Sequence, residues 1–206
     1  MVLRKVYWLL TILFISPAFA YDDCLPYKFT PKVVLDVPVW TKEVVQPLRF
    51  MDLLHGNVSA TMVDNYDIVA DITNIEDGYC VALKSVYATV GYSNFLVQID
   101  IRNKPETCSY NAVLAHEDQH IRAYLSVIDD YKKELQDSIY NAADSITPIF
   151  VRNKEDIDAA ITELNAELQA HPDLILVKQK IKAAEEIRNK RIDQQDTGET
   201  FKKCFE

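Results

Sequence analysis

The sequence predicts an α+β fold in which an N-terminal antiparallel β-sheet is followed by a long antiparallel helical hairpin. Residues 94–102 alternate apolar and polar side chains, which is typical of a half-buried strand. From Ser109 the apolar residues recur at the helical period instead, almost to the end of the chain. We therefore expect one domain over 21–206, β-rich over 21–105 and helical over 109–200, with an H-E-x-x-H motif on its first helix.

The first 20 residues have the pattern of a signal peptide. Two basic residues precede the almost wholly apolar run 6–15, and small residues at positions 18 and 20 form a cleavage site. The apolar run is too short to span a bilayer comfortably. We expect cleavage and a periplasmic or secreted protein, with an uncleaved N-terminal anchor as the alternative.

The net charge of the chain indicates which classes of binding partner are unfavourable. Formal net charge is −9, and removal of the predicted signal peptide leaves 20 basic and 31 acidic residues, a net charge of −11. Such acidity argues against nucleic acid or an anionic membrane as the binding partner. After signal cleavage no stable membrane span is expected, and a peptide or protein substrate remains the predicted partner.

Four cysteines, Cys24, Cys80, Cys108 and Cys204, are widely spaced and form no Cys-x-x-Cys pair. In an exported chain an even, spread set predicts disulfides, with free buried thiols as the alternative. Three connectivities are possible. We favour Cys80–Cys108, which would tie a hairpin to the motif helix, together with Cys24–Cys204, which would tie the two ends.

The first part of the predicted sheet is irregular. Residues 21–52 are spaced by prolines and favour extended edge strand and loop, because proline removes a ladder donor. Short alternating runs follow at 57–63 and 66–73, and Asp64 with Asn65 forms a plausible turn between them.

The strongest strands are predicted at 79–90 and 94–102, joined through residues 91–93. The second of these directly precedes the motif helix. It is expected either to pair with an extended substrate by strand addition or to be an ordinary interior strand.

Three helical stretches follow. The first is expected to run from a Ser109 N-cap to about residue 146, before Pro148. The second covers 154–170. His171-Pro172 then marks a break, after which the apolar stripe continues.

The H-E-x-x-H motif is formed by His116, Glu117 and His120. Residues four apart lie on one face of a helix, so both imidazoles can bind one Zn²⁺. Glu117 stands beside them and can take a proton from a water that the metal activates. Catalytic zinc sites use three protein ligands and a water, so one ligand is still missing.

The missing ligand must come from outside the motif helix. The metzincin extension is excluded, because Ala123 and Ser126 stand where its glycine and third histidine belong. Folding the helices back about residue 149 would place residues 179–186 opposite the histidines. The candidates, among which the choice stays open, are Glu185, Glu186, Asp193, Asp196, Glu199 and His55.

Over residues 78–135 the chain resembles a bacterial family of exported proteins described as zinc-dependent proteases, domain-of-unknown-function family 922. The likeness consists of the cysteine-headed strand from Cys80 and the His116–His120 motif that opens a long helix. The family usually has glycine where Gln119 stands, and a late threonine-x-histidine-glycine element. Residues 191–198 contain aspartates and a threonine but no histidine. The resemblance implies an exported zinc protease.

Two functions follow from these observations. The first is an exported zinc metallopeptidase in which Glu117 acts as general base, with Tyr92, Tyr124 or Tyr131 near the oxyanion. The alternative is a non-catalytic periplasmic protein that binds a partner and carries a vestigial or structural motif helix.

Overall fold

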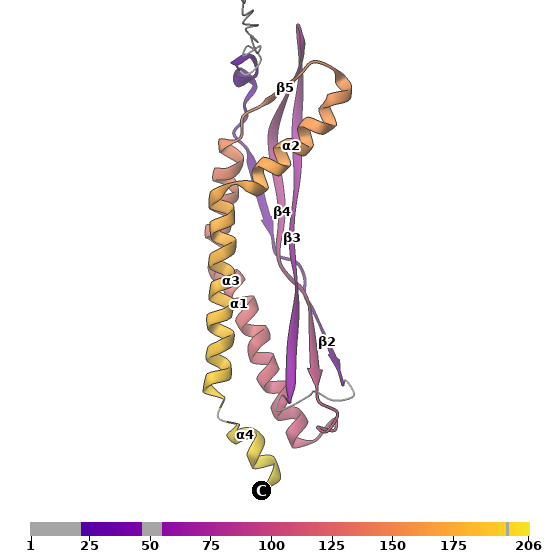
Figure 1. Cartoon of the computed structure of the whole chain (residues 1–206), viewed down its shortest axis with the longest axis vertical. Helices are drawn as coiled ribbons and strands as arrows, with labels where there is room; N and C mark the ends of the chain where they lie inside the picture. Colours follow the sequence, from indigo (N-terminus) through magenta and orange to yellow (C-terminus); the bar gives the residue numbers. More distant parts are fainter. Residues whose placement is uncertain (1–21, 47–54, 197) are drawn as a thin grey trace, which may run out of the picture.

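The computed structural model describes residues 22–46, 55–196 and 198–206. The molecule is elongated, with a long β-ribbon lying beside two long helices and a shorter helix crossing near one end (Figure 1). The predicted signal peptide falls outside the described residues. Among the helices that are described, none has the length and apolar character needed to cross a membrane.

The sheet is built around its longest strand, β4 (Gly78–Ile99). Strand β3 (Gly56–Ile75) pairs antiparallel with β4 over their whole common length. The other edge of β4 is taken in succession by β5 (Ile149–Val151), β1 (Lys32–Asp36) and β2 (Thr41–Val45). The sheet is therefore three strands wide along most of its length.

The predicted antiparallel sheet is wrong, because β1 and β2 both run parallel to β4. A disulfide gives the physical reason. Cys24 is bonded to Cys80 at the start of β4, so the chain that leaves Cys24 runs in the same direction as β4. The two disulfides are Cys24–Cys80 and Cys108–Cys204, so both favoured pairings are also wrong, although all four cysteines are bonded.

Strands β3 and β4 are longer than predicted, because neither expected turn exists. Asp64 and Asn65 lie within β3 and pair with β4. Residues 91–93 lie within β4, where the register shift opposite Thr61 and Met62 is a β-bulge. Gly91 has a φ of 149°, and a Cβ there would lie 3.0 Å from Pro38 Cδ, so this position needs glycine. Because β4 is paired on both edges, it cannot add a substrate strand.

Helix α1 (Cys108–Ser145) matches the predicted first helix except at its cap. The cap is Thr107, whose hydroxyl accepts a hydrogen bond from Tyr110 N at 3.3 Å, rather than Ser109. After Pro148 the β-branched residues of β5 return the chain to the sheet. The short η2 (Lys154–Asp156) and α2 (Ile157–Ala170) follow.

Helix α3 (Pro172–Gln195) begins at the predicted break, with His171 as its N-cap and Pro172 in its first turn. It lies along α1 (Figure 1). The predicted helical hairpin is nevertheless wrong, because β5 and α2 separate the two helices. The α+β class holds, with a mixed sheet and a helical layer in place of a hairpin.

The two ends of the molecule are closed differently. At one end Cys24, in the short η1 (Asp22–Tyr27), and Cys80, which pairs with β5, are fully buried. At the other, Cys108 is exposed and holds α4 (Glu199–Lys202) and η3 (Lys203–Phe205) through Cys204. The core between sheet and helices includes Phe95, Ile99, Leu135, Ile139, Leu164, Leu168, Leu174 and Ile181.

Candidate metal centre

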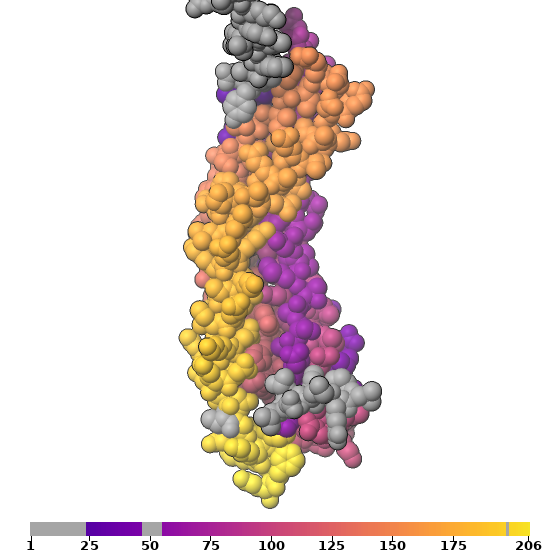
Figure 2. All heavy atoms as spheres, viewed as in Figure 1, coloured from indigo at the N-terminus to yellow at the C-terminus, as the bar shows by residue number. Residues whose placement is uncertain are grey.

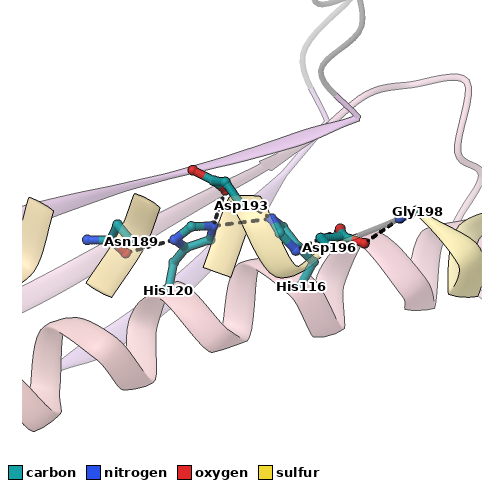
Figure 3. Close-up of polar contacts among 6 residues, drawn as sticks. All are labelled: His116, His120, Asn189, Asp193, Asp196 and Gly198. Carbon is teal, nitrogen blue, oxygen red and sulfur yellow. Dashed lines mark hydrogen bonds and ion pairs between the residues drawn. The ribbon is translucent and has the colours of Figure 1, made fainter. Parts of the chain in front are cut away.

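The motif histidines lie in the third and fourth turns of α1, on the side that faces α3 (Figure 3). Their spacing places His116 and His120 one turn apart, with ring centroids 4.9 Å from each other. The His116 side chain is 21% exposed and the His120 side chain 9%. Both rings therefore project into the interface between the helices and are partly covered by it.

Three atoms converge there. The Nε2 atoms of His116 and His120 are 3.2 Å apart. Asp193 Oδ1, from the last turns of α3, lies 3.1 Å from His120 Nε2 and 3.5 Å from His116 Nε2 (Figure 3). These three residues form a group that could hold a metal ion.

The spacing of the three atoms fits zinc. Tetrahedral coordination at Zn–N and Zn–O distances of about 2.1 Å requires ligand atoms about 3.4 Å apart. The circle through the two Nε2 atoms and Asp193 Oδ1 has a radius of about 1.9 Å, so one point can lie at bonding distance from all three. Asp193 is 63% exposed, which leaves this side of the group open to solvent.

Asn189 fixes the ring of His120. Its Oδ1 lies 2.7 Å from His120 Nδ1. An amide oxygen only accepts hydrogen bonds, so His120 Nδ1 carries the proton and donates it. The lone pair of His120 then lies on Nε2, the atom that points into the group, as in metal sites whose histidines are oriented by an outer hydrogen bond.

His116 is held less firmly. Asp196 Oδ2 is 3.0 Å from His116 Nδ1, but this nitrogen has no hydrogen bond of acceptable geometry. Asp196 is at the C-cap of α3, and its other oxygen accepts a hydrogen bond from Gly198 N at 2.8 Å. Asp196 thus places a negative charge beside His116 without orienting its ring.

Glu117 is the buried member of the motif, with 4% of its surface exposed. Burial raises the pKa of its carboxyl group to about 7, and the nearby carboxylates of Asp193 and Asp118 add to this increase. The start of β3 approaches it closely: a Cβ at Gly56 would lie 2.6 Å from Glu117 Oε1. A larger residue at position 56 would therefore displace the side chains of Glu117 and Val113, whose Cγ1 atom would lie 2.5 Å from the same Cβ.

A cleft of about 660 Å³ opens over this part of the site. Its lining comes from β3, α1, the end of α3 and α4, and includes His116, Glu117, Gly56, Ile192, Asp196 and Thr200. The Cys108–Cys204 disulfide ties η3, which directly follows α4, to the first residue of α1. The wall of the cleft that α4 forms is thus covalently fixed to the helix that carries the motif.

The other predicted ligands lie outside the group formed by His116, His120 and Asp193. Glu185 accepts a hydrogen bond from the Tyr92 hydroxyl, which is therefore not free to bind a substrate oxygen. His55 stacks on Phe201 with ring centroids 4.0 Å apart, and Glu199 lines the cleft. Glu186 is exposed.

The predicted hairpin, folded back at residue 149, placed residues 179–186 opposite the motif histidines. This prediction was wrong, because α2 crosses the ribbon instead of extending a hairpin (Figure 1). Asp193 lies about two helical turns beyond Glu186. Asn189 was missed, although its position one turn before Asp193 on the same face of α3 could have signalled it.

Comparison with known proteins gives no relative. No protein-family model, curated protein or solved structure matches the chain.

Proposed function

We propose that the protein is an exported zinc metallopeptidase that hydrolyses peptide bonds in polypeptide substrates. The observation that carries this proposal is the convergence of His116 Nε2, His120 Nε2 and Asp193 Oδ1 at mutual distances of 3.1–3.5 Å, beside a buried Glu117. Two histidines and one carboxylate, with a fourth position open, form the ligand set of one class of catalytic zinc sites.

We also propose kinship with the exported protease family that the sequence resembles. In this chain Asp193 supplies the third ligand in the region where that family has its late histidine. The two disulfides are compatible with export to an oxidising compartment.

The chain's own residues have separate roles. His116, His120 and Asp193 hold the metal, and Asn189 orients His120 through its Nδ1 proton. A Zn²⁺ ion held there would supply Lewis acidity toward a substrate carbonyl and toward water. Glu117 accepts the proton of the attacking water and passes it to the leaving amine.

Glu117→Gln tests this assignment. The amide keeps the shape of the side chain but cannot accept a proton, so hydrolysis of an unfolded protein substrate should fall about 100- to 10,000-fold. Zinc content should be unchanged, because Glu117 is not a ligand. Glu186→Gln is the matched control, since Glu186 is exposed on α3. Equal activity in Glu117→Gln and wild type would remove Glu117 as the base. Absence of hydrolysis by the zinc-loaded wild type would instead favour a partner-binding role for the motif helix.

A further inference from the structure

A second pocket, of about 460 Å³, lies on the other side of the metal centre from the cleft. Tyr124, in its lining, is one turn after His120 on α1, and Glu185 is two turns before Asp193 on α3. We call it the tyrosine pocket. Its lining residues are Ala60, Met62, Asp64, Tyr92, Tyr124, Lys178, Ile181, Lys182 and Glu185.

The tyrosine pocket, the metal centre and the cleft lie in line. Strand β3 borders the cleft at Gly56 and the tyrosine pocket at Ala60 and Met62. Helix α3 borders the same two hollows with Asp196 and Glu185. Figure 2 shows α3 and β3 flanking one face of the molecule. A polypeptide lying between them would pass the metal centre and place one side chain at the tyrosine pocket.

The tyrosine pocket has the chemistry to recognise a cation. The rings of Tyr92 and Tyr124 meet edge to face, with centroids 5.0 Å apart. Aromatic faces attract ammonium and guanidinium groups. Glu185 adds a half-buried carboxylate that accepts a hydrogen bond from the Tyr92 hydroxyl.

Glu185 has no cationic partner within ion-pair distance among the described residues. Lys178 is occupied, because it pairs with Asp64 at 2.7 Å and lies 4.6 Å from the centre of the Tyr66 ring. Burial raises the pKa of Glu185, and the hydrogen bond from Tyr92 and the charge of Lys182 do not offset it. A further positive charge at this carboxylate would therefore be favourable.

We propose that the tyrosine pocket binds the side chain of a lysine or arginine residue of a polypeptide substrate. This inference rests on the proposed function for the path of the chain past the metal. The ammonium or guanidinium group pairs with Glu185, and its aliphatic stem lies against the rings of Tyr92 and Tyr124. The net charge of −9 favours the approach of such a basic segment.

Binding of blocked peptides tests the proposal. We would prepare fluorescently labelled dodecapeptides, acetylated and amidated, in which a single lysine at a different position is the only charged residue, and partners in which norleucine replaces the lysine. Affinity for the metal-free protein would be measured by fluorescence anisotropy at a fixed salt concentration. At one register lysine should bind about tenfold more tightly than norleucine, an effect of about 1.4 kcal/mol. Glu185→Gln should abolish that difference, whereas the control Glu186→Gln should retain it.

The results separate the inference from the proposed function. Equal affinity for lysine and norleucine at every register, no binding of any lysine peptide, or a lysine preference retained in Glu185→Gln would each overturn the pocket assignment. The zinc-loaded protein is then tested for cleavage of the same peptides. Lysine-dependent binding without hydrolysis would leave the pocket assignment in place and contradict the peptidase. Hydrolysis without any lysine dependence would support the peptidase and contradict the pocket assignment.

Discussion

The two halves of α3 contact the rest of the molecule in different ways. In the first half Leu174, Val177 and Ile181 are buried and belong to the core. None of residues 182–195, all of which the structure describes, is buried. The second half contacts α1 through polar side chains instead. Arg188 contacts Ser126 and Asp130, Asn189 contacts His120, and Asp193 contacts both motif histidines.

This difference indicates that one helix serves two purposes. Its first half stabilises the fold by removing apolar surface from water. Its second half contributes little apolar burial and positions the groups of the candidate metal centre. Substitutions in the two halves should therefore have separable effects, on stability in one case and on metal affinity in the other.

The largest stability effect is expected from Leu174→Ala in the first half. Leu174 is fully buried, and removal of such a side chain costs roughly 2–5 kcal/mol of unfolding free energy. Leu176→Ala is the matched control, because Leu176 is 51% exposed and its change should stay within about 0.5 kcal/mol. Urea unfolding measures both. The comparison fails if the folded Leu174→Ala protein has lost its affinity for zinc.

Asn189→Ala in the second half should give the opposite result. Loss of an outer hydrogen bond to a metal-binding histidine typically lowers metal affinity about 10- to 100-fold. Stability of the metal-free protein should change little, since Asn189 lies outside the buried core. Zinc affinity can be measured by competition with a chelator, beside Lys190→Ala at the next, exposed position. Wild-type affinity in Asn189→Ala would show that His120 does not depend on this contact.

A smaller effect is expected at Glu185, where the polar half of α3 begins. Its pKa is raised in the folded protein. Ionisation of Glu185 therefore has no effect on the free energy of unfolding below the unfolded pKa of about 4.3, and it lowers that free energy as pH rises through the folded value. Glu185→Gln should therefore gain stability over wild type at pH 7.5 and not at pH 4. Urea midpoints at both pH values measure this, with Glu163→Gln, at an exposed position of α2, as control. An equal difference at both pH values would contradict the prediction.

The sequence predicted the motif helix well because the signals there are local. The apolar period from residue 109, Pro148 after the last turn and the His171-Pro172 break each act within a few residues. The four-residue spacing of His116 and His120 determines that both rings share one face. These features require no knowledge of how distant segments pack.

The direction of the edge strands and the third ligand depended on long-range contacts. Strand direction for β1 follows from the Cys24–Cys80 bond, and connectivity cannot be deduced from cysteine positions alone. Asp193 reaches the histidines because β5 and α2 shift the register of α3 against α1. The sequence of residues 146–171 did not predict this register shift, so Asp193 remained one of six candidate ligands.

Metal content most directly tests the claim that α3 completes a zinc site. The wild-type protein, loaded with zinc and dialysed, should retain about one zinc per chain by elemental analysis. His116→Ala, His120→Ala and Asp193→Ala should each lose it, whereas Asp196→Ala should keep it, because Asp196 lies beside His116 Nδ1 and outside the ligand group. A wild-type protein without zinc, or full zinc content in Asp193→Ala, would contradict the account.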